Sequence, residues 1–155
     1  MVLLDTSVWI DRLRHGDAIL ADMLDNGRVL IHPFVIGGLA TGSLRQREVI
    51  LHALRGLPRA IVARDREVLD FIERETLFGS GLGYIDVHLL ASVRLTPGAA
   101  LFTRDKRLNA AAARMPVTVQ VAHRASRSGD DNFNRPAAAR LHRQRLFRGR
   151  PEWTP

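Results

Sequence analysis

Three aspartates stand where short apolar runs end or helical segments begin. Asp5 directly follows the apolar run Val2-Leu3-Leu4, and Asp105 lies two residues past the apolar segment 99–103. Asp86 lies near the start of a helical segment among apolar neighbours, where an unpaired charge is costly. Three carboxylates at one edge of a sheet repel one another unless a hard divalent cation joins them, and Mg²⁺ prefers such oxygen ligands. Together the three acids favour a metal site.

A simpler interpretation exists for each aspartate alone. Aspartate is a preferred helix cap, because its side chain accepts hydrogen bonds from the first backbone N–H groups of the helix. Asp5, Asp86 and Asp105 all lie beside the start of a segment with helical spacing. Taken singly, each is most simply explained as a cap, and only the joint pattern favours metal binding.

The elements that must position these acids alternate along the chain. Short apolar runs predict strands at residues 2–4, 28–32, 60–63, 99–103 and 117–121. Helical spacing predicts a first helix capped by Thr6 or Ser7, a second capped by Asp17 and ended by Asn26-Gly27, and further helices at 34–43, 45–55, 66–77 and 85–95. This alternation predicts an α/β fold with a mainly parallel central sheet flanked by helices. In such a sheet, ligands bind outside the carboxyl ends of the strands.

The composition restricts the kinds of site and partner. The chain has no cysteine, so disulfides, thiolate metal sites and cysteine nucleophiles are excluded. The sequence offers no apolar run long enough to cross a bilayer, and its N-terminus lacks the basic region of a signal peptide, so a cytoplasmic protein without a membrane role is expected. The formal net charge of +7 favours an acidic partner such as nucleic acid.

The charge is unevenly distributed, and this suggests a boundary. From His123 onward there are eight arginines and three acids, so residues 123–155 carry +5 of the total and residues 1–122 carry only +2. A polar stretch at residues 126–132 separates the two parts. We therefore expect one folded domain over residues 1–122, followed by a basic tail over residues 123–155 that is either flexible or packs in trans.

Four segments, taken in order, resemble the successive motifs of VapC-type PIN-domain toxins. They are Met1-Val-Leu-Leu-Asp-Thr-Ser-Val-Trp-Ile-Asp11, Ile31-His-Pro-Phe-Val-Ile-Gly37, Gly83-Tyr-Ile-Asp-Val-His-Leu-Leu-Ala-Ser92 and Leu101-Phe-Thr-Arg-Asp-Lys-Arg-Leu108. The resemblance covers about residues 1–121, which makes the predicted domain a PIN-like nuclease domain. The basic tail has no counterpart in it.

The resemblance implies a function and a site. It implies an endoribonuclease that depends on Mg²⁺ or Mn²⁺, acts on RNA as the toxin of a toxin–antitoxin pair, binds a VapB-like antitoxin and forms a homodimer. By position, Asp5, Asp86 and Asp105 match the family's catalytic and metal-binding acids. Thr6 or Ser7 and Thr103 match hydroxyls that line the same pocket. Arg104, a cation next to Thr103, is expected to bind the RNA backbone, with a solvated helix face as the alternative.

One position departs from the family pattern. After Pro33-Phe-Val-Ile-Gly37 the family has a glutamate that helps to hold the metal, whereas this chain has Gly38. Loss of one ligand predicts reduced or abolished activity. The alternative function is therefore a catalytically inactive PIN-like module that binds an antitoxin or RNA.

Other candidates for chemistry carry less weight. A phosphatase with an aspartate nucleophile at Asp5 would need a second acid two residues on, where the chain has Ser7. His88 lies two positions from Asp86 and so points elsewhere on a helix, and it is expected to be structural, as are His32 and Trp9. Lys106 and Arg107 fit either an RNA backbone contact or a solvated helix face.

Overall fold

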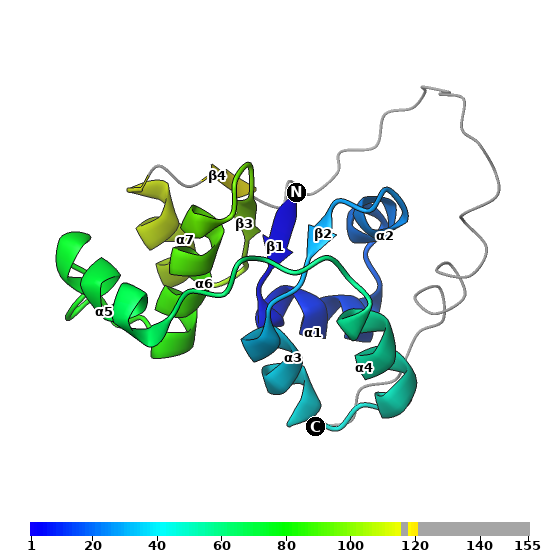
Figure 1. Cartoon of the computed structure of the whole chain (residues 1–155). Coiled ribbons are helices and arrows are strands. Elements are labelled where there is room, and N and C mark those ends of the chain that lie inside the picture. Colours follow the sequence, from blue (N-terminus) through cyan, green and yellow to red (C-terminus); the bar gives the residue numbers. More distant parts are fainter. Residues whose placement is uncertain (116–117, 121–155) are drawn as a thin grey trace.

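A short parallel sheet forms the centre of the molecule. The computed structural model describes residues 1–115 and 118–120. Four strands, β1 (Val2–Leu4), β2 (Val29–Leu30), β3 (Ala100–Phe102) and β4 (Thr118–Gln120), lie in the order β2-β1-β3-β4 (Figure 1). All three pairs of neighbouring strands are parallel. The predicted α/β fold with a parallel sheet is confirmed.

Seven helices surround the sheet in the described part of the chain. They are α1 (Thr6–His15), α2 (Ala18–Asp25), α3 (Pro33–Ala40), α4 (Arg47–Arg55), α5 (Asp65–Arg74), α6 (Tyr84–Leu95) and α7 (Lys106–Ala113). Figure 1 shows α5, α6 and α7 grouped beside β3, while α1, α3 and α4 gather beside β1 and β2. None of these helices is long and apolar enough to cross a membrane.

The central strands are buried on both faces, as their unbroken apolar sequences predict. Every residue of β1 and β3 is buried, and one core joins them to the inner faces of the helices. Trp9 on α1 is fully buried in this core, which confirms its structural role. This packing fixes the carboxyl ends of β1 and β3 side by side, because Leu4 pairs with Phe102.

Two predicted helix boundaries are confirmed and one is wrong. Asp17 caps α2 by accepting hydrogen bonds from the N–H groups of Ile19 and Leu20, and Gly27 follows the helix with a φ of 64°. The first helix, however, begins at Thr6, so its cap is Asp5 rather than Thr6 or Ser7. Ser7 instead turns its hydroxyl back to the Asp5 carboxylate.

The strand predicted at residues 60–63 is not formed. Only one residue of this region bridges to the sheet, where Arg59 pairs with Ile31. Beyond it, the hydroxyl of Ser92 on α6 accepts a hydrogen bond from the N–H group of Ala63 at 3.1 Å, and that of Thr96, the C-cap of α6, accepts from Ile61 at 2.9 Å. Hydroxyl side chains thus take the place of a neighbouring strand.

The last predicted strand, at residues 117–121, corresponds to β4. The basic tail expected over residues 123–155 lies outside the described residues. The boundary drawn at residue 122 also lies there.

Candidate active site

Asp5 is held at the carboxyl end of β1 by two hydroxyl groups. Its Oδ2 atom accepts a 2.6 Å hydrogen bond from Ser7 Oγ and a 3.0 Å hydrogen bond from Thr103 Oγ1. Its backbone caps α1, but its side chain accepts no hydrogen bond from the backbone of that helix. Asp5 is only 7% exposed. A buried carboxylate that is oriented by side chains and does no capping is available for another task.

Thr103 couples Asp5 to Asp105 across the ends of β1 and β3. The N–H group of Asp105 donates to Thr103 Oγ1 at 3.0 Å, and that hydroxyl donates in turn to Asp5. Asp105 also caps α7, because its Oδ1 atom accepts from the N–H groups of Arg107 and Leu108. The capping interpretation is therefore correct for Asp105, although it involves only one of the two carboxylate oxygens.

Asp86 approaches the same edge from the start of α6. Its Oδ2 atom accepts a 3.1 Å hydrogen bond from the N–H group of Gly83, which makes it part of the cap of that helix. Burial raises the pKa of Asp86, the hydrogen bond from Gly83 opposes this, and the charges of Asp5 and Asp105 raise it further. The charges of the three acids thus act on one another, and among them Asp86 is the carboxylate whose charged form is disfavoured.

Each of the three carboxylates has one oxygen atom that could bind a metal ion. Within the described residues, Oδ1 of Asp5, Oδ1 of Asp86 and Oδ2 of Asp105 accept no hydrogen bond. The donor set is therefore all-oxygen, anionic and oriented, which suits Mg²⁺ or Mn²⁺. The described residues contain no group of three Asp, Glu or His side chains placed to hold one ion together. This fits an ion that one or two carboxylates hold and water completes, as is usual for Mg²⁺.

Gly38 lies on α3 where that helix packs closely against Thr6 of α1. A Cβ atom at residue 38 would lie 3.3 Å from Cγ2 and 3.4 Å from Oγ1 of Thr6, the residue next to Asp5 in the chain. A Cβ at the neighbouring Gly37 would meet nothing within 4 Å. A side chain at residue 38 would therefore start against α1 beside Asp5, whereas one at residue 37 would enter open space.

The other residues expected on the substrate side have different surroundings. Ser7 and Thr103 donate to Asp5 and so position it. Arg104 forms ion pairs with Asp11 and Asp17. No local sequence signal could have revealed these pairs, because Arg104 and Asp17 are 87 residues apart.

His32 and His88 are buried structural residues, as expected. Phe34 N–H donates to His32 Nδ1, so the proton of the neutral ring is on Nε2, which lies 3.2 Å from Ser92 Oγ. Nδ1 of His88 lies 3.5 Å from the same hydroxyl, and the two rings meet edge to face. Burial, and secondarily the charge of His88, lower the pKa of His32 from 6.5 to about 4. Neither ring is a member of the acidic cluster.

Comparisons with known proteins agree with the geometry. Two curated relatives, each a protein named Ribonuclease VapC32 and each from a different strain of Mycobacterium tuberculosis, are 48% identical to this chain over 119 residues. The matched region is 77% of this chain and 96% of each relative. No protein-family model matches the chain.

Proposed function

The chain belongs to the VapC family of PIN-domain ribonucleases, and from this premise we propose that it is a metal-dependent endoribonuclease and the toxin of a toxin–antitoxin pair. The observation that carries the proposal is that Thr103 links Asp5 to Asp105 at the carboxyl edge of the sheet and that both charges act on Asp86. Burial, and secondarily the charges of Asp5 and Asp105, raise the pKa of Asp86, and a cation would relieve that repulsion. The name of the relatives supports an RNA substrate.

Asp5, Asp86 and Asp105 supply the carboxylates of the site, of which one or two would bind the divalent cation directly while water completes its coordination. When bound, Mg²⁺ or Mn²⁺ would lower the pKa of a bound water and stabilise negative charge on the phosphate. The protein supplies orientation. Ser7 and Thr103 fix the Asp5 carboxylate, and Gly83 fixes that of Asp86 through its N–H group. Such supporting hydrogen bonds keep the second carboxylate oxygen directed away from the backbone.

Cleavage of RNA by the purified full-length chain tests the proposal. We expect cleavage with Mg²⁺ or Mn²⁺, none with EDTA, and a loss of at least about a hundredfold in Asp5→Asn and Asp86→Asn, since each removes a charge that binds the ion. Glu48→Gln is the matched control, because Glu48 is an exposed acid on α4. If the aspartate variants cleave as the parent does, the assignment of the site is wrong.

A second candidate function rests on Gly38. The chain lacks the side chain that would start at residue 38 against Thr6, the neighbour of Asp5 in the chain. Without it, the chain would be an inactive PIN-like module that binds an antitoxin or RNA. The two candidates differ in one measurement. An impaired enzyme retains slow, metal-dependent cleavage that Asp86→Asn removes. An inactive module shows no cleavage, with or without that substitution.

The proposed toxin needs an inhibitory partner. We expect a VapB-like antitoxin to bind over the acidic edge, which we define as the carboxyl edge of the sheet with Asp5, Asp86 and Asp105. We also expect the chain to form a homodimer. Co-expression with a VapB-like antitoxin, followed by light scattering of the purified complex, tests both expectations. A monomer that does not retain the antitoxin would contradict them.

A further inference from the structure

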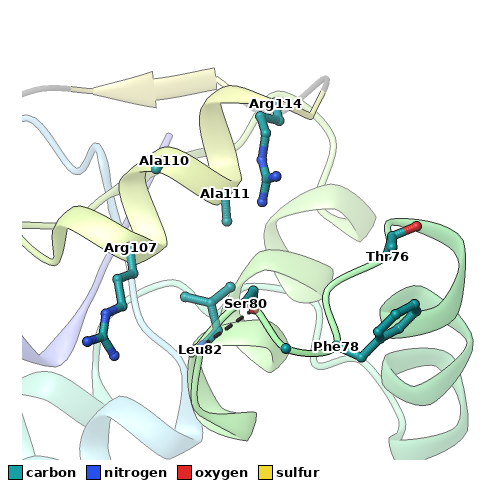
Figure 2. A pocket seen from close by; sticks show the side chains of 9 residues that line it. Thr76, Phe78, Ser80, Leu82, Arg107, Ala110, Ala111 and Arg114 are labelled. Carbon is teal, nitrogen blue, oxygen red and sulfur yellow. Dashed lines mark hydrogen bonds between the residues drawn. The ribbon is translucent and has the colours of Figure 1, made fainter.

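A pocket beside the acidic edge lies outside the proposed catalytic apparatus. It has a volume of about 540 Å³ and lies between α7 and the loop that joins α5 to α6. Its walls include Thr76, Phe78, Leu82, Arg107 and Arg114 (Figure 2). Small-molecule sites usually have volumes of about 300–1,000 Å³, so the pocket is large enough for one nucleotide.

The charge of the pocket is positive. Figure 2 shows Arg107 and Arg114 projecting from the α7 side toward the loop. They are seven residues apart, or two helical turns, so they lie on one face at a spacing of about 10 Å. Both are exposed, and the other residues that line the pocket are uncharged. Within the described part of the chain, neither arginine forms an ion pair. These features complement a phosphate backbone.

Phe78 gives the pocket an aromatic surface. Its side chain is 62% exposed at the loop, an unfavourable position for a large apolar group in water. A single exposed aromatic residue is common, but here it lines the same pocket as two arginines. Base stacking on aromatic side chains beside a cationic groove is how many proteins bind single-stranded nucleic acid without sequence preference.

The backbone of the loop between α5 and α6 allows the Arg107 side chain to contact it directly. Gly79 and Gly81 have φ angles of 70° and 74°, and Thr76 has a φ of 52°, the one positive value among the described residues other than glycine. Arg107 Nη1 donates to the Gly81 carbonyl at 3.2 Å, and a Cβ at Gly81 would lie 3.3 Å from the same nitrogen. Glycine at residue 81 thus allows the contact, which places the guanidinium at the rim of the pocket.

The pocket is directly connected to the acidic edge. The N–H group of Arg107 donates to Asp105 Oδ1 at 2.7 Å, so one residue contacts an acid of the site and also lines the pocket. The same loop continues into Gly83, which holds Asp86. A strand of RNA that leaves the acidic edge along this side would therefore meet the pocket next.

We propose that this pocket binds one nucleotide of a single-stranded RNA substrate, with the base against Phe78 and the phosphates facing Arg107 and Arg114. The proposal rests on the proposed ribonuclease function, whose substrate path it defines. It assigns two binding residues, Phe78 and Arg114, that belong to none of the motifs shared with the family.

The test measures RNA binding separately from cleavage. Fluorescence anisotropy of a short, labelled, single-stranded oligoribonucleotide is followed in EDTA, with the full-length chain. We expect Phe78→Ala to weaken binding by about 5- to 100-fold, as expected for the loss of one stacked base. We expect Arg114→Gln to weaken binding and to lower the slope of log K against log salt by about 0.7, as for one lost phosphate contact on a single strand.

Two substitutions away from the pocket serve as matched controls. Leu69→Ala removes an exposed apolar side chain from α5, and Arg28→Gln removes an exposed arginine just before β2. Both should bind RNA as the parent does. All four variants change exposed side chains, and circular dichroism confirms that they remain folded.

The outcomes separate this proposal from the function on which it rests. If the parent binds and cleaves RNA but Phe78→Ala and Arg114→Gln bind no more weakly than the controls, the pocket proposal is overturned and the ribonuclease function stands. If the parent neither binds nor cleaves RNA, the proposed function fails and the pocket proposal fails with it. Weaker binding confined to the two pocket variants supports both.

Discussion

Replacing Gly38 by glutamate should give opposite changes in stability with and without metal. A Cβ atom at residue 38 faces Thr6 beside Asp5, so the new carboxylate would join the acidic cluster. Glycine within a helix costs about 0.5–1 kcal/mol relative to a good helix former, and the substitution recovers this. A partly solvated pair of like charges several ångströms apart costs on the order of 1 kcal/mol. In EDTA, repulsion from Asp5 and Asp86 therefore cancels or exceeds the helix gain.

Two further variants isolate the charge and its direction. Gly38→Gln has the same contact with Thr6 and a similar helix propensity, but it carries no charge. Gly37→Glu carries the charge on the same helix, but its Cβ meets nothing within 4 Å. We expect Gly37→Glu to raise the Tm by about 2–4 °C with or without metal, since it only improves the helix. In EDTA, Gly38→Glu should melt below both.

Metal should reverse this order. Mn²⁺ at about a hundred times its dissociation constant stabilises the folded state by about 2.7 kcal/mol, and only Gly38→Glu gains a ligand. We expect about tenfold tighter Mn²⁺ binding, equivalent to about 1.4 kcal/mol, and a matching rise in RNA cleavage. Calorimetric titration measures Mn²⁺ affinity, and thermal unfolding in EDTA and in Mn²⁺ measures the change in stability. If Gly38→Glu and Gly37→Glu have the same Mn²⁺ affinity and the same Tm under both conditions, residue 38 does not face the site and the reasoning is refuted.

Three other predictions concern the Thr103 hydroxyl that positions Asp5, the buried side chain of His32 and the basic tail. Thr103→Val removes the hydroxyl between Asp105 and Asp5, so it should cost about 1–3 kcal/mol in urea unfolding and weaken Mn²⁺ binding by about 10- to 100-fold. If Thr103→Val binds Mn²⁺ as tightly as the parent, Thr103 does not position Asp5. Because the pKa of His32 is lower in the folded state, the unfolded chain binds more protons between pH 6.5 and about 4. The free energy of unfolding should thus decrease as the pH is lowered from 6.5 to about 4, by no more than about 3 kcal/mol, with a smaller decrease in His32→Gln; an equal decrease in both proteins would exclude His32 as the cause. Deleting the chain from Ser126 onward should preserve the Tm while lowering the salt dependence of RNA binding, because residues 126–155 carry +4 of the net charge of +7; a large drop in Tm would show that the tail is part of the fold.

The sequence predicted correctly those helix ends that are determined by residues near them in the chain. Asp17 and Gly27 mark the two ends of α2, and each acts through its own backbone neighbours. The strand expected at residues 60–63 is absent for a reason distant in the sequence, because Ser92 on α6 and Thr96 at its C-cap accept the N–H groups of Ala63 and Ile61. Nothing within the segment itself distinguishes a hydroxyl partner from a neighbouring strand.

The same distinction holds for the candidate site. Asp5 and Asp105 could be placed together because apolar runs precede them and parallel strands end at one edge. The part played by Thr103 depends on a hydrogen bond that spans 98 residues, so its side chain was expected to face the substrate rather than to support Asp5. Residue type and strand position identify the acids, while the geometry of their supports requires the fold.

The brevity of β2 affects how copies of this protein can associate. β2 forms one edge of the sheet with only two residues, and the bridge between Ile31 and Arg59 occupies the backbone just beyond it. An edge strand templates aggregation when it offers a long row of unpaired N–H and C=O groups. This edge offers few, so it gives a second chain little backbone on which to extend the sheet by strand addition. On this side of the molecule, self-association would therefore rely on helix surfaces rather than on the edge of the sheet.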